Sequence, residues 1–197
     1  MKGIVKYPYE SFPVYADFYV NLDTNEVVQY YTIDCINRQN GVNSKSLIID
    51  SSSIEDTKVK IVLKGDNDVG DHKITVKADT NNDNEYEIDI PVKITNTRER
   101  NDKFSKQASE EFIITTDFSN DLATSETLSS SFVYAFRLSD GSNFTNYVIE
   151  FSQRSSKIML VGVTGGAGGE LYRIEVKVVT SDGNKFQKNI LMKVQEI

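Results

Sequence analysis

Residues 172–194 read YRIEVKVVTSDGNKFQKNILMKV and contain the clearest strand and turn pattern in the chain. Its first half alternates polar and apolar side chains with a period of two, which is typical of a half-buried β-strand. Asp182 and Gly183 then provide a tight turn, because both residue types tolerate positive φ angles. Since a second strand-forming run follows directly, we predict an antiparallel β-hairpin.

The same pattern occurs 100 residues earlier, where residues 72–94 read HKITVKADTNNDNEYEIDIPVKI. The chain aligns with itself at this offset without a gap over about 85 positions, which indicates a duplicated module. Matching pairs include Glu10 and Glu110, Phe12 and Phe112, Asp17 and Asp117, Phe18 and Phe118, Glu26 and Glu126, Ile74 and Ile174, Val76 and Val176, and Thr80 and Thr180.

The repeat predicts four parts in the chain. Residues 1–9 form an N-terminal arm, 10–94 a first domain, 95–109 a charged linker and 110–197 a second domain. The linker sequence, TNTRERNDKFSKQAS, is polar and charged, as solvated connections between domains are. A short helix or a partner-binding segment is the alternative for this stretch.

Strand-like alternation recurs throughout each unit. In the first unit it falls near 12–18, 27–36, 45–50, 57–64, 71–79 and 85–94, with an uncertain piece around 37–43. No stretch forms a convincing amphipathic helix of ten or more residues. We therefore predict an all-β chain of two tandem immunoglobulin-like β-sandwich domains, each with about seven strands. The spacing leaves the strand order open.

Composition narrows the classes of partner. The net charge of −7 repels phosphate groups, and the 22 Lys and Arg residues form no basic stripe, so we expect no nucleic-acid partner. The start, MKGIVKYPYESF, lacks the apolar run of a secretory signal, and no 18-residue apolar stretch follows, so we expect no membrane association. The single cysteine excludes an intrachain disulfide, which fits folding in a reducing cytoplasm.

Two single residues are candidates for chemistry. His72 is the only histidine and Cys35 the only cysteine. The second unit has Tyr172 and Ala135 at the matching positions, and no partner motif for catalysis accompanies either residue. We interpret both as structural and expect no enzyme activity, no catalytic residue and no cofactor.

Acidic loops raise the question of calcium, which prefers oxygen ligands. They are Asp66–Asp71 and Asp79–Glu85, and neither has the spacing of an EF-hand. Their counterparts in the second unit are a glycine-rich stretch, 165–169, and the Asp-Gly turn, both nearly free of carboxylates. We interpret the loops as turns and expect no metal site.

Motifs of the second unit resemble those of a known family. They are DFSNDL at 117–122, ETLSSSFVYA at 126–135, Gly165-Gly166, YRIEVKV at 172–178, TSDGN at 180–184 and NILMKV at 189–194. They are similar to the small immunoglobulin-like modules encoded among the head–tail genes of tailed bacteriophages, described as neck, fiber–tail adaptor or minor virion proteins. The resemblance covers about 110–195 and extends to about 10–94 through the internal repeat and through Tyr31-Thr32-Ile33-Asp34. The tryptophan that often stands in the opening motif is missing.

The resemblance implies a structural virion protein at the head–tail neck or tail, with other phage structural proteins as partners and several copies per particle. It implies localisation in the virion, and in the host cytoplasm during assembly. The alternative is a carbohydrate- or host-surface-binding sandwich, or a capsid decoration protein. Such a module needs exposed aromatic side chains, and the chain has no tryptophan.

The aromatic segment at the start of the chain is the predicted interface. It contains Tyr7, Pro8, Tyr9, Phe12 and Tyr15, which could form a docking surface for a neighbouring subunit. The alternative is that this segment is the first strand of its own domain.

Overall fold

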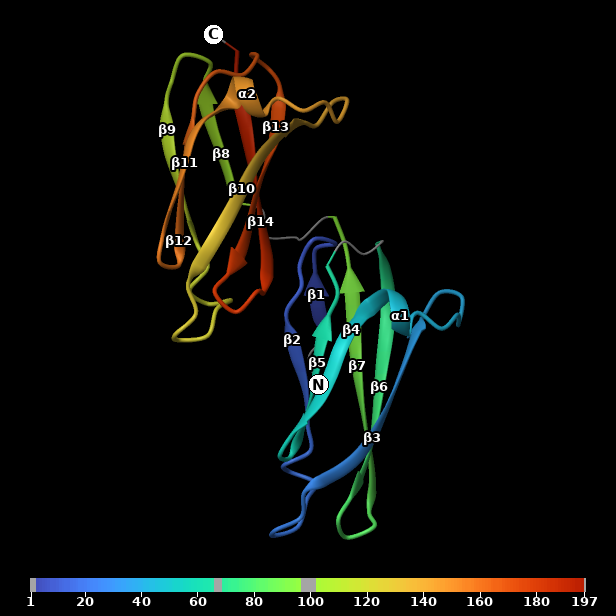
Figure 1. Ribbon diagram of the computed structural model, residues 1–197. Coiled ribbons are helices and arrows are strands. Elements are labelled where there is room, and N and C mark those ends of the chain that lie inside the picture. The colour runs from blue at the N-terminus through green and yellow to red at the C-terminus, as the bar shows by residue number, and fades with distance from the viewer. Residues whose placement is uncertain (1–2, 66–68, 97–101, 197) are drawn as a thin grey trace. The chain divides into compact units, whose positions relative to one another are not determined.

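The computed structural model describes residues 3–65, 69–96 and 102–196. The chain divides into two compact units, Met1–Arg98 and Glu99–Ile197, and each is a β-sandwich (Figure 1). The first unit contains β1 (Ile4–Lys6), β2 (Pro13–Asp17), β3 (Val28–Asn37), α1 (Lys45–Ile48), β4 (Ile49–Glu55), β5 (Lys58–Leu63), β6 (Gly70–Thr80) and β7 (Glu85–Ile94). The second contains β8 (Asp102–Gln107), β9 (Phe112–Asp117), β10 (Leu128–Arg137), α2 (Thr145–Val148), β11 (Ile149–Ser155), β12 (Ile158–Val163), β13 (Leu171–Thr180) and β14 (Lys185–Gln195).

Each domain has one four-stranded and one three-stranded sheet. The orders are β1-β7-β6-β3 and β2-β5-β4 in the first domain, and β8-β14-β13-β10 and β9-β12-β11 in the second. Neighbouring strands are antiparallel, except that the first strand of each domain runs parallel to the last. This is the strand arrangement of an immunoglobulin-like sandwich, so the predicted fold class is confirmed.

Alternating side chains from the two sheets of each domain meet in its core. In β6 and β13 alternate apolar side chains point inward and are fully buried, with charged or polar residues between them: Ile74, Val76 and Ala78 in β6, and Ile174, Val176 and Val178 in β13. Large buried side chains of the core are Tyr7, Phe18, Ile61, Leu63, Ile74, Ile90 and Ile94 in the first domain, and Phe118, Met159, Tyr172, Ile174 and Met192 in the second.

The hairpin predicted for residues 172–194 is present, and so is its counterpart at 72–94 in the first domain. In the second, the main-chain N–H of Thr180 donates to the carbonyl of Asn184 at 2.9 Å, and Gly183 has a φ of 81°. In the first, Asp83 adopts the same left-handed conformation with a φ of 59°. The turn thus needs a residue that tolerates positive φ, as the sequence indicated.

The linker predicted for 95–109 is wrong over Asp102–Gln107. These residues form β8, which pairs in parallel with β14 through main-chain groups and so needs no apolar run. Within Lys103–Gln107, Phe104 and Lys106 turn toward the core, and Lys106 is 1% exposed. Its ammonium donates to the carbonyls of Gln107 and Glu110, at 2.8 and 2.9 Å, while burial lowers its pKa.

The segment predicted as an N-terminal arm is also part of a domain over Ile4–Lys6. These residues form β1, which pairs in parallel with β7 as β8 does with β14. Lys6 is buried, like Lys106 at the matching position. The repeat therefore begins several residues before Glu10.

A strand was expected near 45–50, but Lys45–Ile48 form the single turn α1, and β4 begins only at Ile49. The side chain of Asn43 accepts the main-chain N–H of Lys45 at 3.0 Å, which favours a turn over an extended start. Asn143 and Thr145 make the same contact before α2, at 2.9 Å.

Candidate docking surface of the second domain

The outward side of β10 carries three aromatic side chains at alternate positions, Phe132, Tyr134 and Phe136. Successive residues of a strand point to opposite faces, and Ala135 between them is fully buried. Phe132 is 50% exposed, and the ring centroids of Tyr134 and Phe136 lie 6.3 Å apart. The domain thus presents a row of aromatic rings on the outside of its four-stranded sheet.

Charged residues of β13 lie beside this row. The Lys177 ammonium is 5.4 Å from the Tyr134 ring centroid, and the Arg173 guanidinium carbon is 5.7 Å from that of Phe136, within the range of cation–π attraction. Glu175 forms ion pairs with Arg173 at 2.9 Å and with Lys177 at 3.2 Å. We call the following six residues the aromatic face: Phe132, Tyr134, Phe136, Arg173, Glu175 and Lys177.

The corresponding face of the first domain is charged. Thr32, Asp34 and Ile36 stand where the second domain has its aromatic row. Across β6 and β7, Lys73 pairs with Asp89 at 3.0 Å. The Thr75 hydroxyl and the Lys73 ammonium both lower the pKa of Asp89. A folded domain of this type therefore does not require aromatic residues on this face.

Amides replace two carboxylates next to the aromatic face. Gln187 and Asn189 stand where the first domain has Glu87 and Asp89, and they are only 6% and 5% exposed. The Gln187 amide donates to the Asn189 side-chain oxygen at 2.8 Å. The exchange removes two negative charges from this side of the sheet.

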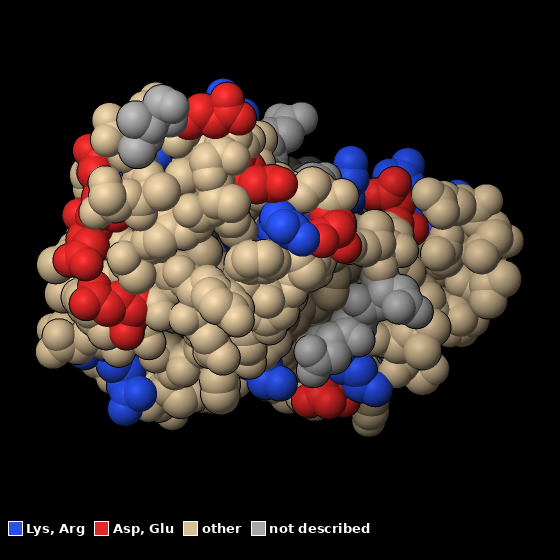
Figure 2. Space-filling view, turned by 90° about the horizontal axis from the view of Figure 1, so that it is seen from above, with Lys and Arg blue, Asp and Glu red and all other residues tan. Residues whose placement is uncertain are grey.

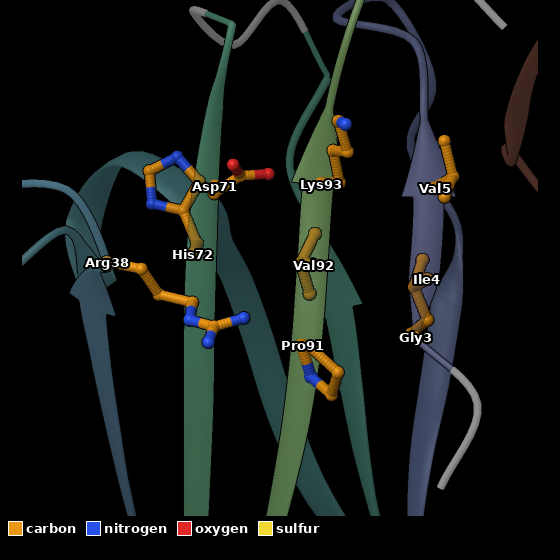
Figure 3. Close-up of a pocket in the computed structure, with 9 residues that line it drawn as sticks. All are labelled: Gly3, Ile4, Val5, Arg38, Asp71, His72, Pro91, Val92 and Lys93. Atoms are coloured by element: carbon orange, nitrogen blue, oxygen red, sulfur yellow. The ribbon is translucent and has the colours of Figure 1, made fainter.

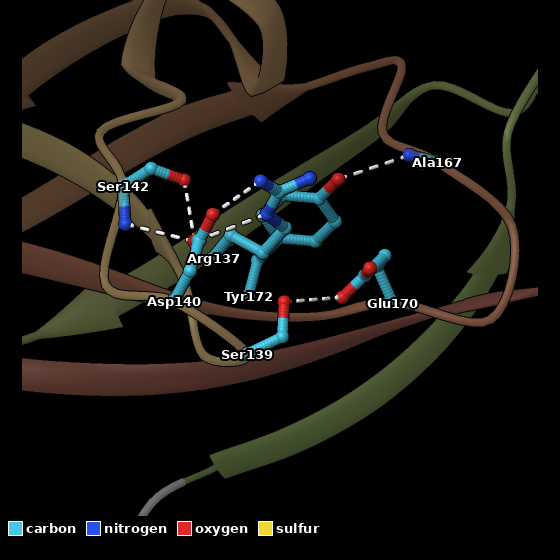
Figure 4. Close-up of polar contacts among 7 residues, drawn as sticks. All are labelled: Arg137, Ser139, Asp140, Ser142, Ala167, Glu170 and Tyr172. Atoms are coloured by element: carbon cyan, nitrogen blue, oxygen red, sulfur yellow. Dashed lines mark hydrogen bonds and ion pairs between the residues drawn. The ribbon is translucent and has the colours of Figure 1, made fainter.

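Loops at one end of the second domain are held by polar contacts (Figure 4). Arg137 forms an ion pair with Asp140, and its guanidinium carbon lies 4.6 Å from the Phe144 ring centroid. Arg137 and the hydroxyl of Ser142 hold the pKa of Asp140 well below its usual range. Ser139 donates to the Glu170 carboxylate at 3.0 Å and joins this loop to the one before β13.

Tyr172 fixes the glycine-rich loop at the same end. Its hydroxyl accepts the main-chain N–H of Ala167 at 3.0 Å (Figure 4), the contact known from immunoglobulin domains as a tyrosine corner. The stretch 165–169 is therefore anchored within its own domain.

A shallow pocket of about 220 Å³ lies on the first domain (Figure 3). Arg38 and Lys93 bring two cations to its lining, and Asp71 brings a carboxylate. Asp71 and His72 are neighbours in β6 and point to opposite sides, so they do not form an acid–base pair. The lining residues are Gly3, Ile4, Val5, Arg38, Asp71, His72, Pro91, Val92 and Lys93.

Charged side chains of both signs are mixed on the face shown in Figure 2. Lys and Arg occur there singly or in small groups near Asp and Glu, with wide uncharged areas between them. Among the described residues, no helix is long and apolar enough to cross a membrane.

The structure places the predicted interface residues largely within the first domain. Tyr7 is 2% exposed, and Pro8, Tyr9 and Phe12 are partly buried. Only Tyr15, on the outward side of β2, is 41% exposed. The five residues therefore do not form a continuous exposed surface.

The single histidine and cysteine lie together in the first domain. The hydroxyl of Ser44 is 3.0 Å from Nδ1 of His72 and 3.4 Å from Sγ of Cys35. Burial lowers the pKa of His72 and raises that of the Cys35 thiol. At neutral pH the imidazole of His72 is therefore neutral and the thiol of Cys35 is protonated.

Residues 66–68 of the first acidic loop lie outside the described residues. In the described ranges, no group of three or more His, Cys, Asp or Glu side chains is placed to hold a metal ion.

The aromatic face was not identified from the sequence. The run Phe132–Phe136 is apolar at every position, so its periodicity does not tell which side faces the core. The signal lies in the repeat, because Thr32 and Asp34 mark the outward positions of the matching strand.

Comparisons with solved structures find titin fragments that align over nearly the whole of this chain. Titin domains Z1Z2 in complex with telethonin have 11% identity and a TM-score of 0.31, over 98% of this chain and 92% of that one. A chimeric titin Z1Z2 functionalized with a decorin peptide has 12% identity and a TM-score of 0.36, over 99% and 93%. No curated protein matches the chain.

A family model described as "Podophage GP4 fiber-tail adaptor protein gp77" matches residues 106–193. The matched range extends from the end of β8 to β14 and includes the whole aromatic face. It confirms the resemblance carried by the motifs between 117 and 194. The second domain of this chain is therefore similar to the phage fiber–tail adaptor family.

Proposed function

We propose that the chain is a structural protein of a tailed-phage virion, located at the head–tail neck or tail, and that it joins other phage structural proteins through protein–protein contacts. The family match over 106–193 is the observation that carries this proposal. The chain would be made in the host cytoplasm and be present in several copies per particle.

The aromatic face is the surface we assign to docking. Aromatic and arginine side chains are enriched where interfaces bind most strongly, since they bury much area at a low entropic cost. Phe132 is half exposed, whereas Tyr134 and Phe136 are already flanked by Lys177 and Arg173. Phe132 would therefore gain most from contact with a partner.

The buried polar side chains support a role in stabilising the two domains, not a role in catalysis. Three of them repeat at matching positions in the two domains, which points to a structural role: Lys6 and Lys106, Glu26 and Glu126, and Thr80 and Thr180. His72 and Cys35 both contact the hydroxyl of Ser44. We therefore propose that the protein acts without catalysis.

Carbohydrate binding is the second candidate, because a row of aromatic rings on a sheet is also a platform on which sugars stack. Two of the three rings have a cation beside them, which leaves less ring surface for a sugar. Binding to a glycan array that is lost in Phe132→Ala would favour this candidate over protein docking.

Incorporation into particles tests the docking proposal. A phage that lacks the gene is complemented with wild-type or variant chains, and quantitative mass spectrometry measures the chain in purified particles. Phe132→Thr, which copies Thr32 of the first domain, should reduce incorporation at least about tenfold.

Tyr30→Ser is the matched control. Tyr30 is 66% exposed on the outward side of β3, and Ser130 stands at the matching position of β10. This variant should be incorporated like the wild type. Normal incorporation of a folded Phe132→Thr chain would exclude the aromatic face as the docking surface.

A further inference from the structure

β9 is an edge strand of the second domain (Figure 1). It pairs with β12 on one side, and no strand of the described ranges pairs with it on the other. The first strand of the domain, β8, belongs to the opposite sheet, and its Phe104 ring contacts the Phe112 ring edge-on, with the centroids 6.2 Å apart. An uncovered edge offers main-chain donors and acceptors to another strand.

The hydrogen bonds between β9 and β12 show which residues of β9 direct their main-chain N–H and C=O groups toward the open edge. The N–H of Phe118 donates to the carbonyl of Lys157 at 2.9 Å, so even-numbered residues of β9 face β12. In an antiparallel pair the facing residues alternate with residues whose N–H and C=O point away. Ile113 and Thr115 therefore direct their main-chain groups to the free edge.

The first domain protects the same edge with a proline. The N–H of Leu63 donates to the carbonyl of Phe12 at 3.1 Å, which gives β2 the same phase as β9. Pro13 thus lies where Ile113 lies, at a position that faces the free edge. Because proline has no N–H, it weakens edge pairing in the first domain. The second domain has lost this protection.

The side chains next to the edge strand are charged in the first domain and apolar in the second. In the first domain, Lys58 pairs with Asp17 at 2.9 Å and Lys60 with Glu55 at 3.2 Å on the outer face. Isoleucine and leucine replace the two lysines in the second domain, as Ile158 and Leu160. The outer face next to β9 is therefore apolar.

A glycine completes this apolar surface. Phe151 of β11 lies over Gly162 of β12, where a Cβ atom would come within 2.3 Å of its ring. Gly162 pairs with Ile113 on its other side. Ile113 is 63% exposed and Phe151 39% exposed, so the surface reaches from the middle of the sheet to its open edge.

We propose that two copies of the chain associate through their β9 strands, antiparallel and about a two-fold axis at Ile113. The two Ile113 residues would face each other and exchange main-chain hydrogen bonds, and each Thr115 would pair with Glu111 of the second copy. The two three-stranded sheets would then join into one continuous sheet.

A second copy is the partner that this edge fits, because β9 is self-complementary. In the proposed register the two exposed Ile113 side chains meet on the outer face. On the other face Phe112, which is 42% exposed, meets Ile114. Glu111 lies opposite Thr115, so no like charges face each other. A two-fold contact also closes on itself and does not propagate into fibres.

The oligomeric state of the purified full-length chain tests the proposal. Sedimentation velocity between about 1 and 100 µM should show a concentration-dependent dimer. Ile113→Pro should be monomeric over this range. Pro13 shows that the fold accepts proline at this position, and circular dichroism checks that the variant is folded.

Ile113→Lys provides a second route, because it keeps the N–H but places two positive charges at the axis; it should also be monomeric. Pro13→Ile is the matched control in the first domain and should leave the dimer formed through β9 intact. A wild-type chain that stays monomeric, or a dimer that survives in folded Ile113→Pro, would overturn the proposal. The result is separate from particle incorporation, which tests the proposed function.

Discussion

The hydroxyl of Thr80 donates a hydrogen bond of 2.5 Å to the buried carboxylate of Glu26. This contact joins the segment before β3 to the hairpin between β6 and β7. The amide of Asn84 donates to the same carboxylate at 2.9 Å, and the main-chain N–H of Asp23 donates at 2.8 Å. The second domain repeats the arrangement with Thr180, Asn184 and Glu126, so the cluster is part of the fold.

The Thr80 contact predicts a pH dependence for the first domain. Hydrogen bonds from Thr80 first, then from Asp23 and Asn84, lower the pKa of Glu26 in the folded state. Stability from this group is therefore complete above the unfolded pKa, about 4.3, and is lost as the pH falls through the lower folded value.

In Thr80→Val the folded pKa of Glu26 should lie closer to its unfolded value. The unfolding free energy should therefore fall less steeply below about pH 4.3 than in the wild type. Urea denaturation across a pH series measures this. Equal slopes for the two chains would show that Thr80 does not set the pKa of Glu26.

The tyrosine corner predicts a domain-specific loss of stability. Tyr172→Phe removes the acceptor for the Ala167 N–H and should cost about 1 kcal/mol in the second domain. Hydrogen exchange measured by mass spectrometry should show faster exchange at 165–169. Tyr147, which is 72% exposed, supplies the control, and Tyr147→Phe should leave exchange unchanged.

Replacing Gly183 should lower the stability of the second domain through backbone strain alone. Its φ of 81° is unfavourable for residues with a Cβ, while a Cβ there would meet no atom within 4 Å. Gly183→Ala should therefore destabilise the second domain by roughly 1 kcal/mol without a steric clash. Thermal unfolding measures the effect, and Asp182→Ala at the exposed neighbouring position should cause a smaller change.

The sequence predicted those elements whose pattern is local. The hairpins at 180–184 and 80–84 could be predicted because alternation and turn residues lie together in the chain. The 100-residue repeat then extended each prediction to the other domain. Strands β1 and β8 could not be predicted in this way, since Ile4–Lys6 is short and Asp102–Gln107 is polar. Both depend on parallel pairing with a strand more than 80 residues away.

The candidate surface was harder to predict than the fold. Tyr7 was predicted at an interface and is buried, whereas Phe132 was not identified from the sequence and is exposed. An apolar run such as Phe132–Phe136 has no polar residue to mark its outward side. Comparison with the charged first domain supplies that mark, which is why the differences between the domains locate both proposed interfaces.

Particles assembled without this chain provide the most direct test of the proposed adaptor role. Electron microscopy and quantitative mass spectrometry of purified phage from a gene deletion would measure tail and fiber content per head. We predict heads with tails or fibers missing, restored by the wild-type chain supplied from a plasmid. Deletion particles with normal tail and fiber content and normal infectivity would contradict the account.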